Sequence, residues 1–188
     1  QNGPKGEIYG VEASADYRIL DGLTLSFNGI WMHGRFKNFP DGNASVQGTA
    51  GNLYDLNNPG DPLSSTVSQD WSGLRLINAP DISLNAGFTW ELPVGPGTLS
   101  ISPNLKYSST YAPNGILLAS NGKNLLERGA QTLVDMSVGY AVGRFKLTAY
   151  ASNLFNNQFY AEPNYSALGI YGLWVEPQTF GARLEFKY

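Results

Sequence analysis

The sequence lacks cysteine and contains a single histidine, His33. Without cysteine, the chain can form no disulfide scaffold and perform no thiol chemistry. Any nucleophilic triad would have to be built around His33, and a lone histidine is far more often a surface residue. Asp and Glu residues are scattered singly, with no pair at a spacing typical of glycosidases or metal sites. The sequence therefore gives no support for an enzyme, and no cofactor is expected.

Charge and long apolar runs are also scarce. Charged residues make up 14% of the chain, against roughly a quarter in ordinary soluble domains. The formal net charge of -3 gives no electrostatic footprint for nucleic acid. No run of about 20 apolar residues occurs, which excludes a transmembrane helix. The search for a long apolar run does not detect a transmembrane β-barrel, because polar residues occupy every second position of its strands.

Aromatic residues and glycine are abundant. Aromatics make up 13% of the residues, and there are 22 glycines. This composition suits many strands joined by tight turns, with aromatic side chains at a membrane interface. Apolar residues recur with a period of two, and no helical period extends over a comparable length. The composition therefore favours an all-β protein.

About seven extended segments alternate between an apolar and a polar face. The last is the clearest, with Phe180, Ala182, Leu184, Phe186 and Tyr188 on one face and Gly181, Arg183, Glu185 and Lys187 on the other. The segments are residues 7–19, 23–36, 82–92, 98–108, 130–142, 144–152 and 177–188. Most approach the length that crosses a bilayer at a tilt, about 9 to 11 residues. Pro103 interrupts one of them and predicts a β-bulge there.

The links between these segments alternate between short and long. The short links are Asp21–Gly22, residues 93–97 and residues 142–144; the long ones are 37–81, 109–129 and 153–176. In an antiparallel up-and-down meander, all short turns then lie at one end and all long loops at the other. Outer-membrane β-barrels have this geometry. A soluble carbohydrate-binding β-sandwich remains an alternative, since such sheets also alternate.

Four stretches carry a family resemblance. They are GEIYGVEASADYRILDGLTLSFNG (6–29), GLRLINAPDISLNAGFTW (73–90), ASNLFNNQFY (151–160) and PQTFGARLEFKY (177–188). In this order and spacing they resemble the C-terminal part of the β-barrel of TonB-dependent outer-membrane receptors. Gln178 stands where that family usually has Arg, and Tyr188 where Phe is commoner.

The resemblance implies a place in the Gram-negative outer membrane and a transport function. It implies a transmembrane β-barrel of roughly 22 strands, of which residues 1–188 would be the C-terminal segment, without the plug and the first part of the barrel. The whole protein would import iron-siderophore complexes or similar large, scarce nutrients, energised by the TonB complex through the plug. A passive porin-like barrel is the alternative within the outer membrane. Partners would include outer-membrane lipid and a small-molecule ligand such as a ferric siderophore.

The resemblance also implies which face does what. The apolar face would contact lipid, and the polar face would point into the lumen. The lumen side chains would be Glu12, Asp16, Arg18, Asn28, Asn85, Glu91, Asn104, Lys106, Asp135, Lys146, Arg183 and Glu185. At the C-terminus, the implied signal for the barrel-assembly machinery consists of Leu184, Phe186 and Tyr188.

Ligand binding is expected on the long links, because function concentrates on loops held by a rigid scaffold. The candidate ligand-binding residues are Trp71, Arg75, Tyr111, Tyr165, Tyr171 and Trp174, with Lys123 and Arg128 as further cations. Their rings could stack on the flat parts of a siderophore, porphyrin, corrin or sugar, or could form the outer aromatic girdle instead. The cations could attract an anionic complex or be simply solvated. Asp55, Asn57, Asn58 and Asp61 could line a calcium loop, but their spacing better fits ordinary turns.

Overall fold

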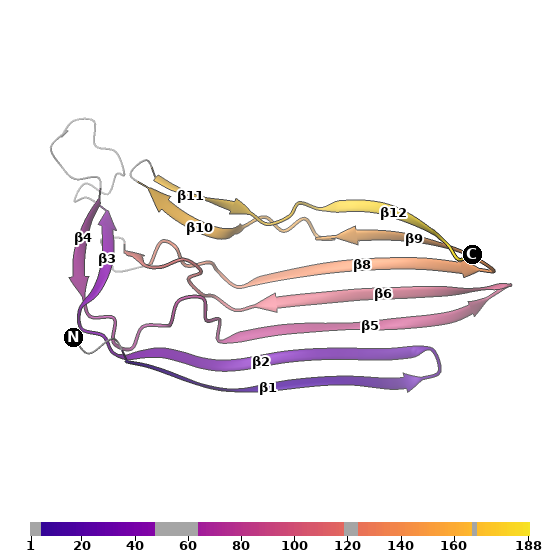
Figure 1. Ribbon diagram of the computed structural model, residues 1–188, viewed down its shortest axis with the longest axis horizontal. Helices are drawn as coiled ribbons and strands as arrows, with labels where there is room; N and C mark the ends of the chain where they lie inside the picture. The colour runs from indigo at the N-terminus through magenta and orange to yellow at the C-terminus, as the bar shows by residue number, and fades with distance from the viewer. Residues whose placement is uncertain (1–4, 48–63, 119–123, 167–168) are drawn as a thin grey trace.

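A seven-stranded antiparallel sheet forms the body of the molecule (Figure 1). The computed structural model describes residues 5–47, 64–118, 124–166 and 169–188. Along the sheet, the strands are β1 (Lys5–Leu20), β2 (Leu23–Asn38), β5 (Ile82–Val94), β6 (Gly97–Ser108), β8 (Gln131–Val142), β9 (Phe145–Ser152) and β12 (Thr179–Phe186). Each corresponds to one predicted segment, so the antiparallel meander is confirmed. In the described ranges, no helix is long and apolar enough to span a membrane.

The pairing register keeps the apolar positions of neighbouring strands on one face. One apolar row runs across four strands through Leu99, Tyr140, Leu147 and Leu184. A polar row runs across four strands through Ser14, Asn28, Asn85 and Lys106. Because a shift of one residue would exchange the two faces of a strand, this register preserves the alternation seen in the sequence.

The apolar face has no protein layer over it. Tyr17, Phe180 and Leu184 remain 67%, 67% and 68% exposed. Among the described residues, all extensive contacts between elements join strands paired in the same sheet, and no helix or second sheet is stacked on this face. A soluble sandwich would bury such rows against a second sheet about 10 Å away. The apolar face is instead available to lipid.

The two ends of the sheet differ as the link lengths predict. The three short turns lie together at the right of Figure 1, each with a glycine at positive φ: Gly22 (80°), Gly95 (57°) and Gly143 (57°). The long links lie together at the opposite end, here called the outer end. They contain additional strands that the sequence did not predict: β3 (Gly42–Gln47), β4 (Ser64–Gln69), β7 (Leu117–Leu118), β10 (Tyr160–Ser166) and β11 (Gly169–Trp174). Strands β10 and β11 form a hairpin, while β3 pairs with both β4 and β7.

Pro103 does not produce the predicted bulge. Strand β6 pairs with β5 at Gly87–Asn104 and again at Trp90–Ile101, which is three residues further along each strand. The register is therefore unchanged, and only the pairs between these two positions are missing. On its other side, Pro103 is aligned with Met136 of β8. The proline, which has no N–H to donate, interrupts one ladder without adding a residue to it.

A small packed cluster lies at the outer end, away from the faces of the sheet. The ring of Trp71 is only 8% exposed, and Phe36, Phe39 and Ile116 pack against it. The Trp71 ring centre lies 5.8 Å from that of Phe36 and 5.1 Å from that of Phe39. Trp71 N–H also donates to the Phe39 carbonyl at 2.8 Å through the backbone. This cluster anchors the 39–81 link onto the end of β2.

Candidate functional site at the outer end

An arginine–carboxylate network joins four distant parts of the chain at the outer end. Arg35 of β2 donates to both carboxylate oxygens of Asp81, at 2.9 and 3.2 Å. Arg75 donates to Asp81 at 2.7 Å and to Glu127 at 3.1 Å. Arg75 also donates to the Thr110 carbonyl at 2.8 Å. Since forked guanidinium contacts fix both distance and plane, the network holds the first two long links, 37–81 and 109–129, against the end of β2.

The charges of this network set the protonation of Asp81, which directly precedes β5. The hydrogen bonds from Arg35 hold the pKa of Asp81 below its ordinary value. Partial burial opposes this effect, and the hydrogen bond and charge of Arg75 add to it. A carboxylate that accepts from two arginines stays ionised at neutral pH.

Replacing Asp81 with asparagine is expected to loosen the outer end. Because the folded-state pKa is depressed, the stabilisation is complete above the unfolded value of about 4 and is lost as the pH falls through the folded value. At pH 7 the substitution should cost about 1 to 3 kcal/mol in the free energy of opening of these links, toward the lower figure because the side chains of the network are partly exposed. The measurement is the rate of proteolysis of the links in the detergent-solubilised protein between pH 7 and pH 3.

Asp21→Asn is the matched control for this prediction. Asp21 pairs with Arg18 in the exposed turn at the other end of the sheet. The substitution makes the same chemical change there, and Asn-Gly suits a hairpin turn as well as Asp-Gly does. The expected result is a faster, less pH-dependent cleavage for Asp81→Asn only. Equal profiles for Asp81→Asn and the wild type would contradict a structural role of the network.

A second arginine arrangement lies beside this network. The Arg128 guanidinium sits 4.5 Å from the ring centre of Tyr111 and 5.3 Å from that of Phe159. The backbones of Tyr111 and Arg128 are also bridged by two hydrogen bonds, of 3.1 and 2.8 Å. Within the described residues, Arg128 forms no salt bridge, and its buried Nε has no hydrogen-bond partner. Aromatic rings contact this cation, and in the part of the chain that the structure describes no carboxylate pairs with it.

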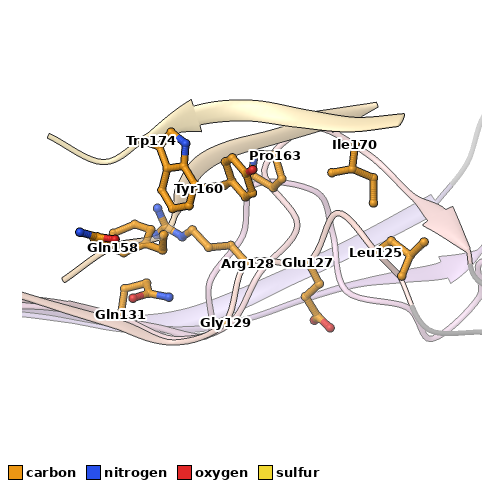
Figure 2. Close-up of a pocket in the computed structure, with 11 residues that line it drawn as sticks. Leu125, Glu127, Arg128, Gly129, Gln131, Gln158, Tyr160, Pro163, Ile170 and Trp174 are labelled. Carbon is orange, nitrogen blue, oxygen red and sulfur yellow. The ribbon is translucent and has the colours of Figure 1, made fainter. Parts of the chain in front are cut away.

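Arg128 borders a cavity of about 440 Å³ beneath the β10–β11 hairpin (Figure 2). Tyr160 and Trp174 form an aromatic wall, with ring centres 4.3 Å apart and planes 33° apart. Gln131 and Gln158 bring amide groups to the opposite side. Trp174 also lines a second cavity of about 340 Å³, together with Asn156, Asn157, Gln158, Val175 and Pro177. The outer end thus offers aromatic, amide and cationic groups around open space.

The turn after β9 supports one side of both cavities. Asn153 is 4% exposed and has a φ of 48°. Its amide donates to the carbonyls of Asn157 and Glu176, at 2.9 and 3.0 Å, and accepts from Asn157 N–H at 2.9 Å. Gln178 donates to the Leu154 carbonyl at 2.6 Å. These bonds tie the segment before β12 to the end of β9 and so fix the foot of the β10–β11 hairpin.

The predicted ligand-binding residues occupy different environments. Trp71 is buried in the packed cluster, and Arg75 is held in the carboxylate network. Tyr111 lies under Arg128, and Trp174 lines both cavities. Tyr171 is 54% exposed on β11. Tyr165 lies in β10, but its side chain, together with Lys123, Asp55, Asn57, Asn58 and Asp61, falls outside the described residues. Contact with a ligand stays a prediction for all of them.

Several residues of the site were not identified from the sequence. Arg35, Asp81, Glu127 and Tyr160 were absent from the candidate set. Asp81 and Arg35 are 46 residues apart, so no local spacing connects them. Asn153 belongs to the recognised NLFNN stretch, and that motif was the available signal for the turn. In the described part of the chain, no three His, Asp or Glu side chains gather as a metal site would require.

The sequence matches a protein-family model described as TonB dependent receptor-like, beta-barrel, over residues 1–154. The chain belongs to this family. Among curated proteins, none matches the sequence.

Three solved receptor structures share the fold. The ferric yersiniabactin uptake receptor FyuA from Yersinia pestis superimposes with a TM-score of 0.72 at 17% identity, covering 100% of this chain and 24% of that one. The siderophore receptor PiuA from Acinetobacter baumannii gives 0.68 at 15% identity, covering 98% and 22%. BauA, the ferric preacinetobactin receptor from the same organism, gives 0.62 at 16% identity, covering 97% and 22%. The chain therefore spans about a quarter of the length of these receptors.

Membership of the TonB-dependent receptor family fixes the class and the compartment. The family consists of transport receptors of the Gram-negative outer membrane rather than enzymes. In β-barrels of that membrane, an apolar sheet face without protein cover contacts lipid. The terminal residues lie beyond the matched range. There, Leu184 and Phe186 lie on the apolar face, with the Phe186 ring centre 5.0 Å from that of Phe145, and Tyr188 is fully exposed. Their role in barrel assembly stays a prediction.

Proposed function

We propose that residues 1–188 form the C-terminal segment of the barrel of an active importer of ferric siderophores or similar large, scarce nutrients. In this proposal, the sheet supplies part of the wall of a roughly 22-stranded barrel, its polar face lines the lumen, and its long links help to bind the ligand. Import is energised by the TonB complex acting on a plug domain. No covalent step is involved.

The family match over residues 1–154 carries the proposal. Two features of the fold support it. The sheet separates an apolar from a polar face, as a wall between lipid and lumen requires. The outer end carries two cavities bordered by Trp174, one of which is also bordered by Arg128, and these suit recognition of a bulky chelate. The structural neighbours FyuA, PiuA and BauA are themselves described as siderophore receptors or uptake receptors.

Uptake of radioactive iron tests the proposal directly. The gene encoding this chain would be deleted in its host, and cells would be supplied with a panel of iron-loaded siderophores under iron limitation. The expected result is loss of uptake of at least one chelate, with recovery when the gene is restored. If deletion changes the uptake of no chelate, the iron-import proposal fails.

A second arm tests how import is energised. Removal of TonB, or collapse of the proton-motive force, is expected to abolish the same uptake while leaving ligand binding to the cells intact. A passive porin-like barrel would instead conduct without TonB. Uptake that persists at the wild-type rate in the absence of TonB would therefore replace active import with passive diffusion.

A further inference from the structure

The cavity bordered by Arg128 has an uneven distribution of charge. Three arginines and two carboxylates meet at this end of the sheet: Arg35, Arg75, Arg128, Asp81 and Glu127. Arg35 and Arg75 share Asp81, and Arg75 also binds Glu127. Arg128 is left without a carboxylate partner among the described residues. Arg128 is therefore the one of these three arginines without a carboxylate partner in the described ranges, and it lies at the cavity.

The only negative side chain among the described residues that line the cavity is Glu127. Its Oε1 atom accepts from Arg75 at 3.1 Å, on the side of the network. The Glu127 and Arg128 side chains point in different directions, although the two residues are adjacent in the sequence (Figure 2). By pairing with Glu127, Arg75 keeps the cavity cationic, which is a positioning role.

The groups around Arg128 indicate what kind of anion it can bind. The rings of Tyr111 and Phe159 pack against the guanidinium, and among the described residues no carboxylate takes up its N–H donors. Donors in the guanidinium plane match the paired oxygens of a carboxylate or catecholate. Tyr160 and Trp174 supply a flat apolar wall in the same cavity. Thr132 lies on the apolar face of β8. Because successive side chains alternate between the faces, Gln131, the first residue of the strand, lies on the polar face.

We propose that this cavity binds an anionic, aromatic-bearing metal chelate, with Arg128 as the anchor for the anion and Trp174 as the stacking wall. The proposal rests on the proposed function and narrows its ligand class. An anionic chelate that carries aromatic rings can both pair with Arg128 and stack on Trp174. A neutral, non-aromatic chelate of the same size can make neither of these interactions.

Calorimetric titration of the full-length, detergent-solubilised receptor tests this inference. The probes are a hexadentate iron(III) tris-catecholate, which is anionic and aromatic, and a hexadentate iron(III) tris-hydroxamate of zero net charge. Arg128→Gln is expected to weaken binding of the tris-catecholate by about ten- to a hundredfold, the loss of one charge-assisted hydrogen-bonded contact. Arg128→Lys should recover part of the loss, because lysine keeps the charge but not the planar fork. Trp174→Ala should also weaken binding.

Arg144→Gln is the matched control. It removes the same charge at the short-turn end, adjoining Gly143, and should leave binding of both probes unchanged. Heat-dependent gel mobility of each variant confirms that the barrel is folded. The inference would be overturned if the Arg128 variants fold and bind the tris-catecholate with wild-type affinity. It would also be overturned if the wild-type receptor binds only the neutral chelate. Both outcomes would leave the proposal of siderophore import intact. A receptor that binds neither probe, together with cells whose iron uptake is unchanged by gene deletion, would overturn both.

Discussion

Replacing Phe27 with arginine is expected to destabilise the folded protein in a lipid bilayer by about 2 to 4 kcal/mol, the cost of an arginine on the lipid face near the bilayer midplane. Phe27 lies midway along the apolar run of β2 from Leu23 to Trp31. In the sheet it is aligned with Ala15 of β1 and Ala86 of β5, both also apolar. An arginine there has no water and no carboxylate to compensate its charge.

Asn28→Arg separates the effect of the face from the effect of the charge. Asn28 is the next residue along β2, and its row contains Ser14 and Asn85 on the polar face. The same charge should be tolerated there. Phe27→Leu controls for loss of the ring and should cost less than about 1.5 kcal/mol, as apolar exchanges of similar volume do. The measurement is equilibrium unfolding by guanidinium in lipid vesicles, and equal costs for Phe27→Arg and Asn28→Arg would show that Phe27 does not face lipid.

Replacing Asn153 with alanine is expected to open the turn after β9, at a cost of about 2 to 4 kcal/mol. The substitution removes two donated hydrogen bonds and one accepted hydrogen bond at a site that is 4% exposed. It also places alanine at a φ of 48°, where a residue other than Gly, Asn or Asp is strained. The segment from Asn157 to Glu176, including the β10–β11 hairpin, should lose its attachment at both ends.

Two further variants divide this cost into its parts. Asn153→Gly removes the same hydrogen bonds without the backbone strain. Asn156→Ala introduces similar strain, at a φ of 52°, on an exposed side chain. Hydrogen exchange of residues 157–176 is the measurement, since it reports the free energy of local opening. Exchange in Asn153→Gly as slow as in the wild type would show that the amide contacts do not hold the hairpin.

The strands of the main sheet were predictable because each depends on a local pattern. In a strand with one apolar and one polar face, the side-chain pattern repeats every two residues. Segments such as 82–92 and 98–108 can therefore be recognised without knowledge of the strands beside them. Turn signals such as Asp21–Gly22 then mark their ends. Once the apolar positions of one strand face one side of the sheet, the pairing register of the next strand is constrained, because a shift of one residue would bring polar side chains to the apolar face. The error at Pro103 had a local cause as well, since a missing N–H can interrupt a ladder without an inserted residue.

The outer end was not predictable in the same way. The strands β3, β4, β7, β10 and β11 lie within long links whose residues show no sustained alternation. The roles of individual residues there depend on partners far away in the sequence. Trp71 and Trp174 are the same residue type on two different long links, yet one is buried against Phe36 and the other borders two cavities.

The sequence by itself determined the all-β class, the seven long strands, the separation of their two faces and the end at which the long links gather. These properties follow from side-chain alternation and turn chemistry, which act over a few residues. Only the tertiary structure decided which of the outer-end arginines pair with carboxylates among the described residues. Asp81 and Glu127 reach Arg75 across gaps of 6 and 52 residues. Only chain folding brings these charges together and places the Arg128 guanidinium against the rings of Tyr111 and Phe159.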